Sequence, residues 1–442
     1  MAPPLPFDVP DLTLAQGTTA TLRRVYGASL HKLLADFLRT PVACVPLADR
    51  ALWHEVRRVC DPVQRADPKR LLVALRCPTL STLLHCIARH ATPTGDHAAL
   101  GRWLREAAAL LLLGLAASGD LAAAVTVGAG ADGRVPRLLL PALDLEVEPS
   151  AAVRAWRFRP GAVDVIGADG LLGTVDLSAR PVAADGVLEC RLQRPYPEIA
   201  PGIRLALADN NPLSDFEAHP DKHGNTLDLG GRPLEEWIAS LRASVQAIAD
   251  HLPLLAEEMR LLLRLVVPVG WDAEKHLSAS YQEAVGLVYL TLHPQQMTMT
   301  EALIHEFQHN KLNALFALDP LLHNAFAPLY PSPVRPDPRP LHGVVLAVHA
   351  FQPVAMLYRR MLENDPQLGS NRLFVQRFRT ILAMNRAGAA TVLAHGQPTV
   401  VGRSVLDEMR RLDAEFARYE TAVFGAAPGQ EGEFFDAALA EA

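Results

Sequence analysis

Hydrophobic residues in the first part of the chain recur mostly at spacings of three and four. Clear examples are the stretches LRRVYGASLHKLLADFL and LGRWLREAAALLLLGLAA, whose apolar positions fall on one side of an α-helix. The pattern predicts helices from Thr13 to about Val127. The most apolar run, Ala107–Gly119, lies between charged residues and is shorter than the roughly 17–25 residues that a membrane-spanning helix needs. We therefore expect it to form a buried helix.

Between about Arg134 and Leu207 the pattern changes to short apolar runs separated by Gly, Pro and Asp, as in VDVIGADGLLGTVDL and GVLECRLQ. Such runs are typical of strands joined by turns. The next segment, Ala208–Pro233, is rich in Asn, Asp, Gly and Pro and predicts an irregular surface loop. His219 and His223 in this loop are four residues apart, but the neighbouring proline and glycine argue against the helix that would align them on a metal.

A long amphipathic helix is predicted from about Leu234 to Leu265, where apolar residues again follow the helical period. The continuous apolar run GLVYLTL, Gly286–Leu292, predicts a buried strand. Two later stretches, LFVQRFRTILAMNRAGAATVLAHG and GRSVLDEMRRLDAEFARYETAVFG, have the period of helices.

The stretch ALIHEFQHNKL contains an H-E-x-x-H motif, with His305 and His309 four residues apart and Glu306 beside the first. Thr298 and Glu301 have the form of a capping box and predict that a helix begins about there. Residues four apart on a helix differ by roughly 40° in direction, so both imidazoles would project toward one point and suit a metal ion. A pattern with three fixed letters also occurs by chance on a half-exposed helix.

Glu306 is turned by about 100° from His305 around the predicted helix. It would lie at the edge of the metal face, where it could act as a base on a bound water or orient a substrate, rather than serve as a ligand. A third ligand must then come from elsewhere in the chain. His349 is our first candidate and His342 the alternative, because both lie on a predicted helix after a proline-rich turn. Either could instead be an ordinary core histidine.

Together these patterns predict an α+β fold that is mostly α-helical. We divide the chain into a helical N-terminal domain (1–130), a small central β-rich region (131–207) and a zincin-like, mainly helical domain that carries the H-E-x-x-H motif (208–442).

The composition limits the classes of protein to which the chain can belong. The chain has 442 residues, half of them hydrophobic and 20% charged, with a formal net charge of -6, which is typical of a globular protein and gives no reason to expect nucleic acid or a membrane as a partner. Its first residues carry acid and proline in place of the basic start and apolar core of a secretory signal, so we expect a cytoplasmic protein. The five cysteines form no C-x-x-C pair and predict reduced packing residues. The sequence does not indicate the oligomeric state.

The stretch from about Asp209 to Leu362 resembles a known family. Its segments HLSASYQEAVGLVYLTLHP, MTEALIHEFQHNKLNAL, YPSPVRPDPRPL and VHAFQPVAMLYRRM are similar to those of bacterial HExxH-motif peptide-modifying enzymes associated with ribosomally made natural products. Members are described as iron- and 2-oxoglutarate-dependent peptide β-hydroxylases. The resemblance implies Fe(II), held by His305, His309 and His349, with Glu306 as a direct ligand still open.

The resemblance also implies residues for the cosubstrate and the substrate. The distal carboxylate of 2-oxoglutarate needs a cation, and arginine pairs with both of its oxygens; Arg339 is the first candidate and Arg335 the second, although either could be a plain surface charge. Ser278, Ser280 and Tyr281 would line the cleft and offer hydrogen bonds to an extended precursor peptide.

Three functions follow from these observations. The first is hydroxylation of side-chain β-carbons in a ribosomally made precursor peptide. The alternative is a zinc metallopeptidase, in which Glu306 acts as general base on a zinc-bound water. A further alternative is a peptide-binding protein without catalytic activity. The sequence does not identify the peptide, the modified residue or the role of the N-terminal helices.

Overall fold

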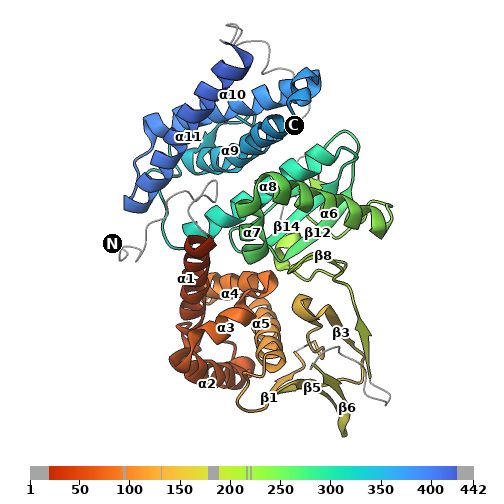
Figure 1. The fold of residues 1–442 in the computed structure, drawn as a ribbon. Helices are drawn as coiled ribbons and strands as arrows, with labels where there is room; N and C mark the ends of the chain where they lie inside the picture. Colours follow the sequence, from red (N-terminus) through yellow and green to blue (C-terminus); the bar gives the residue numbers. More distant parts are fainter. Residues whose placement is uncertain are drawn as a thin grey trace. The chain divides into compact units, whose positions relative to one another are not determined.

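The computed structural model describes residues 19–92, 96–130, 132–177, 189–215, 218–219 and 222–425. This part of the chain holds 11 α-helices and several small sheets, so the predicted α+β, mostly helical class is confirmed. The chain divides into two compact units (Figure 1). Unit 1 comprises Met1–Tyr26, Asp228–Leu263 and Pro268–Ala442, and unit 2 comprises Gly27–Leu227 and Arg264–Val267.

Unit 2 combines the N-terminal helices with the β-rich region. Its helices form where the helical period was predicted: α1 (Thr19–Leu38, from Gly27 onward), α2 (Arg50–Ala66), α3 (Pro68–Leu75), α4 (Pro78–His90) and α5 (His97–Ala117). Proline at the first position starts α3 and α4. The carboxylate of Asp96 caps α5 by accepting from the backbone N–H groups of Ala98 and Ala99 at 2.9 and 3.0 Å.

Helix α5 is the centre of unit 2. Every residue from Ala107 to Ala116 except Gly114 is buried, and the helix contacts α2, α3 and α4 as well as strands of the β region. The run predicted to be a buried helix is therefore confirmed. A helix that is apolar on all sides needs neighbours on all sides, and here helices and strands both provide them.

Strands β1 to β7 of unit 2 form two antiparallel sheets. The first has the order β1-β4-β5-β6 and the second β2-β3-β7. In the first sheet the buried carboxylate of Asp164 accepts from the Arg157 Nε at 2.9 Å and the Arg159 Nε at 3.0 Å. Strand bounds are β1 (Val125–Gly128), β2 (Leu138–Leu140), β3 (Leu145–Pro149), β4 (Ala155–Arg159), β5 (Ala162–Gly167), β6 (Gly170–Asp176), β7 (Cys190–Gln193), β8 (Glu198–Ala200) and β9 (Ile203–Leu205).

The predicted loop Ala208–Pro233 is mostly irregular. Within its described residues, Pro212–Asp215 forms a 3-10 turn, and β10 (Ala218–His219) pairs with β11 (Lys222–His223). His219 and His223 thus lie on a short hairpin and not on a helix.

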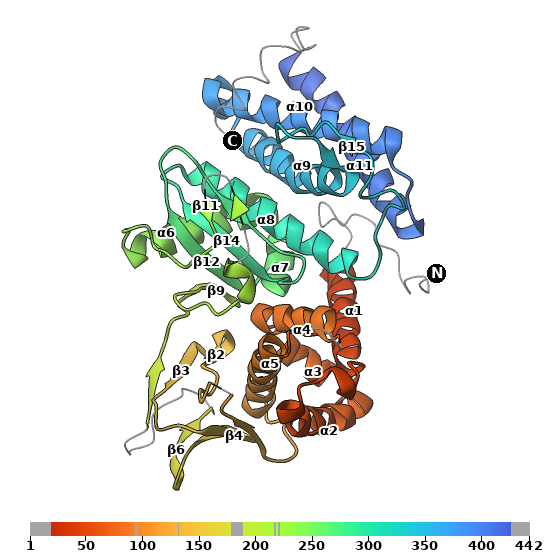
Figure 2. The ribbon, with the colours of Figure 1, turned by 180° about the vertical axis from the view of Figure 1, so that it is seen from behind.

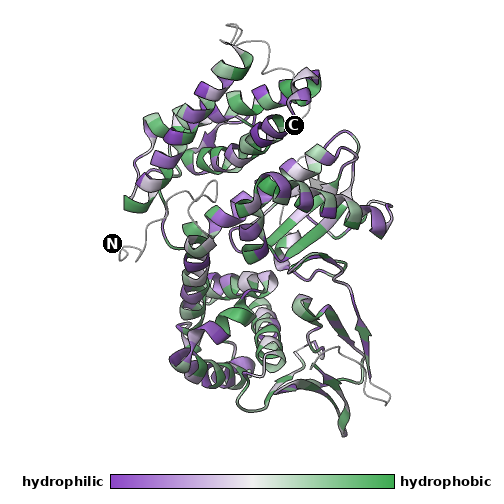
Figure 3. Cartoon of the chain, in the orientation of Figure 1, coloured by the Kyte–Doolittle hydropathy of each residue, from purple (hydrophilic) through white to green (hydrophobic). Residues whose placement is uncertain are grey.

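Unit 1 contains the motif. Helices α6 (Leu234–His251) and α7 (Pro253–Leu262) precede strands β12 (Leu265–Trp271, in unit 1 from Pro268 onward), β13 (Ser278–Ala279) and β14 (Leu287–Leu292). Every residue of β14 is buried, which confirms the predicted strand; β12 and β14 are green in the hydropathy colouring of Figure 3. The single long helix predicted from Leu234 to Leu265 is wrong. It is broken at Leu252–Pro253, because proline has no N–H to continue the helical ladder.

The motif helix α8 (Gln296–Phe316) packs against α6, α9 and β14 (Figure 2). After it come a short pair of strands and three long helices: β15 (Leu329–Tyr330), β16 (Arg339–Pro340), α9 (Leu341–Asn364), α10 (Arg372–His395) and α11 (Val400–Phe424). Among the described helices, α9 alone is long and apolar enough to cross a membrane, unless α3 and α4 are taken together across a 100° bend. Because 78% of that α9 window is buried and core helices meet the same criterion, this is weak evidence for a membrane.

Candidate metal centre

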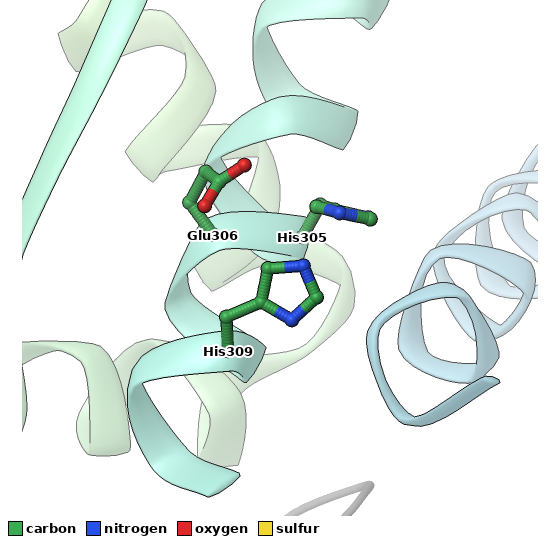
Figure 4. A group of neighbouring side chains, drawn as sticks. All are labelled: His305, Glu306 and His309. Carbon is green, nitrogen blue, oxygen red and sulfur yellow. The ribbon is translucent and has the colours of Figure 1, made fainter. Parts of the chain in front are cut away.

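His305, Glu306 and His309 lie together on α8. Each offers a ligand atom, and the three atoms lie within 4.8 Å of one another. The two imidazoles are half-buried and their ring centroids are 4.3 Å apart at an interplanar angle of 79°. Figure 4 shows the rings side by side on the helix, with Glu306 beside them. The predicted convergence of the motif follows from the helical geometry.

The predicted capping box is wrong. Helix α8 begins at Gln296, two residues before Thr298, and its N-cap Gln295 makes no side-chain cap bond. Glu301 has other partners. Its carboxylate accepts from the Tyr358 hydroxyl at 2.5 Å and from Arg377 Nη2 at 2.6 Å. These bonds tie α8, one turn before His305, to helices α9 and α10.

A buried ion pair holds the other end of the motif. Lys311 Nζ lies 2.6 Å from Glu258 Oε2 on α7, and the two side chains are 0% and 2% exposed. Because an unpaired charge in this environment would be very costly, the pair fixes the position of α8 against α7. The motif therefore sits between two polar anchors on one helix.

Both motif histidines are poised as neutral imidazoles. Burial holds the pKa of His305 well below its ordinary value, and the charges of His309 and Arg335 lower it further. Burial also lowers the pKa of His309, while the Glu306 carboxylate acts in the opposite direction. A neutral ring has a lone pair to give to a metal.

The residues present fit a divalent metal ion. Among the described residues, His305 Nδ1, His309 Nδ1 and Glu306 Oε2 are buried and have no hydrogen-bond partner. Buried polar atoms in native proteins are nearly always paired. Three such atoms in one group of side chains are therefore consistent with a bound metal ion. Two imidazoles and a carboxylate form a donor set common to non-haem iron and zinc.

Ser278 contacts Glu306 directly. Its hydroxyl donates to Glu306 Oε1 at 2.6 Å. Ser278 was predicted to bind substrate, and the structure places it on the glutamate. Ser280 has a buried hydroxyl without a hydrogen-bond partner among the described residues, and the Tyr281 ring packs edge-on against Tyr289 at 5.9 Å.

The structure does not bring His349 or His342 into the group of ligand atoms. His349 is fully buried on α9, and both its ring nitrogens lack a hydrogen-bond partner within the described chain. Burial holds the pKa of its imidazole well below the ordinary value, with smaller contributions from Lys311 and His309. The His342 ring is packed between Phe316 and Phe326, at 4.3 and 5.1 Å between centroids.

The two predicted arginines differ in their surroundings. Arg339 is in an ion pair with Asp337, at 2.8 Å between Nε and Oδ2. Arg335 is exposed, and its charge lowers the pKa of His305. Of these two arginines, Arg335 is therefore the one with an electrostatic effect on His305.

Sequence reasoning missed several residues near the motif. Arg377 and His276 both lower the pKa of His305. The sequence contains one spacing signal for each of these two residues. Glu301, which binds Arg377, is four residues before His305 and so shares its face of the helix. His276 is two residues before Ser278 and so shares its face of an extended segment.

The chain was compared with known proteins. No family model matches it, and no curated protein is similar to it in sequence. A proposal for its function therefore depends on the geometry of the site and on the resemblance of the short segments around the motif.

Proposed function

We propose that the protein hydroxylates side-chain β-carbons of a ribosomally made precursor peptide, using Fe(II) and 2-oxoglutarate. The observation that carries this proposal is the group of His305, Glu306 and His309, with neutral imidazoles and buried donor atoms that lack protein partners. Non-haem iron uses such a donor set and keeps positions open for small molecules. The resemblance of the surrounding segments to iron-dependent peptide hydroxylases selects this chemistry from those that the donors allow.

His305 and His309 would hold the iron, with Glu306 beside it and His349 as the candidate from α9. Bound iron would supply oxidation by O₂, one oxygen atom entering the peptide C–H bond and the other converting 2-oxoglutarate to succinate and CO₂. The protein's own part is to place the reactants and to exclude water. Arg335 is better suited than Arg339 to bind the distal carboxylate, because of the two only Arg335 is among the charges that lower the pKa of His305.

The peptide would bind along β13. This strand pairs with β14 in antiparallel register and stands at the end of the strand order β13-β14-β12 within unit 1. A terminal strand offers backbone groups to an extended peptide, which then adds as a further strand. Its residue Ser278 contacts the motif, so such a peptide would lie near the metal group.

The test is oxygenation in vitro. The purified protein is loaded with Fe(II) without oxygen, then given 2-oxoglutarate, O₂ and the peptide encoded beside its gene. We expect the peptide to gain the mass of one oxygen and succinate to form in equal amount. His305→Ala and His309→Ala should abolish both, with Arg335→Ala raising the 2-oxoglutarate concentration needed. Absence of succinate with iron bound, with or without peptide, would refute the proposal.

One observation favours a second candidate, a zinc metallopeptidase. Glu306 Oε2 is buried beside the two imidazoles and has no hydrogen-bond partner among the described residues, as expected of a base that takes a proton from a metal-bound water. Peptide cleavage with zinc and without any oxo acid, abolished in Glu306→Gln, would establish this function instead.

A further inference from the structure

We propose that Ser278 is the positioning residue of Glu306, fixing its carboxylate at the metal group from the strand β13. The inference deepens the proposed function and rests on it only for the statement that a metal binds at His305 and His309. It assigns to Ser278 a role toward the glutamate in place of direct hydrogen bonding to the peptide.

The first step is the contact itself. Ser278 Oγ donates to Glu306 Oε1 at 2.6 Å, which is at the short end of the range for O–H···O hydrogen bonds. Glu306 is 3% exposed, so water cannot easily replace this donor. A glutamate has three side-chain torsions, and one strong bond to a strand residue selects among its conformers.

The second step is the asymmetry of the carboxylate. Ser278 takes Oε1, whereas Oε2 is buried with no hydrogen-bond partner in the described part of the chain. A carboxylate buried only for stability would have both oxygens satisfied. One tethered oxygen and one open oxygen, beside two imidazoles, suit a group that is held ready for an ion or for its bound water.

The third step is the position of Ser278 in the sheet. Ser278 belongs to β13 and pairs there with Leu290 of β14. A peptide added to β13 would therefore be aligned on the same backbone whose side chain holds Glu306. Register of the peptide and placement of the carboxylate would then depend on one residue.

The chain offers a matched control in Ser280. It is the same residue type, it lies two residues further along, and its hydroxyl is buried, but it makes no hydrogen bond to Glu306 among those that the structure shows. A general effect of removing a serine hydroxyl from this segment should appear at both serines. An effect that acts through Glu306 should appear only at Ser278.

The experiment uses Co(II) as the probe, because its absorption spectrum reports the geometry around the ion and its binding can be titrated without turnover. The variants are Ser278→Thr and Ser278→Val, which have nearly the same shape but differ in the hydroxyl, together with Ser280→Ala. We expect Ser278→Val to change the Co(II) spectrum and weaken binding by about 10- to 100-fold, the usual effect of removing an outer partner of a metal site. Ser278→Thr and Ser280→Ala should stay close to wild type.

A double variant shows whether the effect passes through the glutamate. In a Glu306→Gln background, adding Ser278→Val should change Co(II) affinity by less than about 2-fold, since coupled residues are not additive. Equal losses in Ser278→Val and Ser280→Ala, a wild-type spectrum in Ser278→Val, or full additivity with Glu306→Gln would overturn the inference. Failure of the proposed function would look different: Co(II) would bind with the expected Ser278 dependence, but Fe(II) and 2-oxoglutarate would yield no oxidised peptide.

Discussion

The ion pair between Lys311 and Glu258 allows a sharp test of what holds the motif helix in place. Both side chains are almost completely buried and their charged atoms are 2.6 Å apart. Lys311→Met leaves the Glu258 carboxylate without its cation, and breaking a buried pair in this way costs about 3–5 kcal/mol. For a unit of this size that corresponds to a fall in the melting temperature on the order of 10 °C.

The stability lost in Lys311→Met should depend on pH. Burial raises the pKa of Glu258, and Lys311 lowers it, so Lys311→Met raises the pKa further above its unfolded value of about 4.3. The folded variant then keeps a proton that the unfolded chain releases. Its stability is greatest below about pH 4.3 and is lost as the pH rises through the raised pKa. We expect a larger deficit relative to wild type at pH 8 than at pH 5.

Removing both charges should behave differently from removing one. In Lys311→Met with Glu258→Leu no charge is left buried, and replacing a buried pair by apolar residues is often neutral or stabilising. Urea-dependent hydrogen exchange, followed by mass spectrometry at peptides of α7 and α8, measures the free energy of unfolding for this part of unit 1. A deficit below about 1 kcal/mol for Lys311→Met, no pH dependence, or a double variant as unstable as the single one would refute this reasoning.

Two further predictions concern single hydrogen-bonding groups. Burial acts to raise the pKa of Asp164, but hydrogen bonds led by that of Arg157 leave it lowered, so its stabilisation is present above the unfolded pKa and lost as the pH falls through the folded one. Asp164→Asn should lower the free energy of unfolding in urea by about 2 kcal/mol at pH 7 and reduce the loss of stability as the pH falls into the acid range. An unchanged dependence of stability on acid pH would contradict this. Pro353 cannot donate to the carbonyl of His349 four residues earlier, and Gln308 Nε2 donates to it instead, at 3.2 Å. Gln308→Leu should cost about 1–3 kcal/mol, and Pro353→Ala should recover part of that loss; equal losses in the single and double variants would argue against this compensation.

Elements with a strong local signal could be predicted from the sequence. The second half of helix α5, from Ala107 onward, and strand β14 are predominantly apolar and form buried elements, as their runs indicated. The break between α6 and α7 was missed because the apolar period continues across Leu252 and Pro253. The hydrophobic pattern records side chains, whereas the break comes from a missing backbone N–H.

The error at the start of α8 has a different cause. Glu301 stands where a capping-box glutamate would stand, but its carboxylate binds Tyr358 and Arg377, which are 57 and 76 residues away. Two charge-assisted bonds from distant residues outweigh one bond to a local backbone N–H. A sequence motif shows only the local backbone group that Glu301 could bind. Its distant partners, Tyr358 and Arg377, cannot be identified from the motif.

The same distinction explains which part of the site could be predicted. His305, Glu306 and His309 lie on one helix, and helical geometry alone brings their ligand atoms together. No such local rule places a side chain of α9 relative to the motif, because its position depends on how α9 packs against α8. The backbone of His349 is held by Gln308, whose direction on α8 is roughly 100° from that of His309. The proline that opens this carbonyl thus ties the backbone of His349 to Gln308 of α8, a contact between residues 41 apart in the chain that no local sequence pattern encodes.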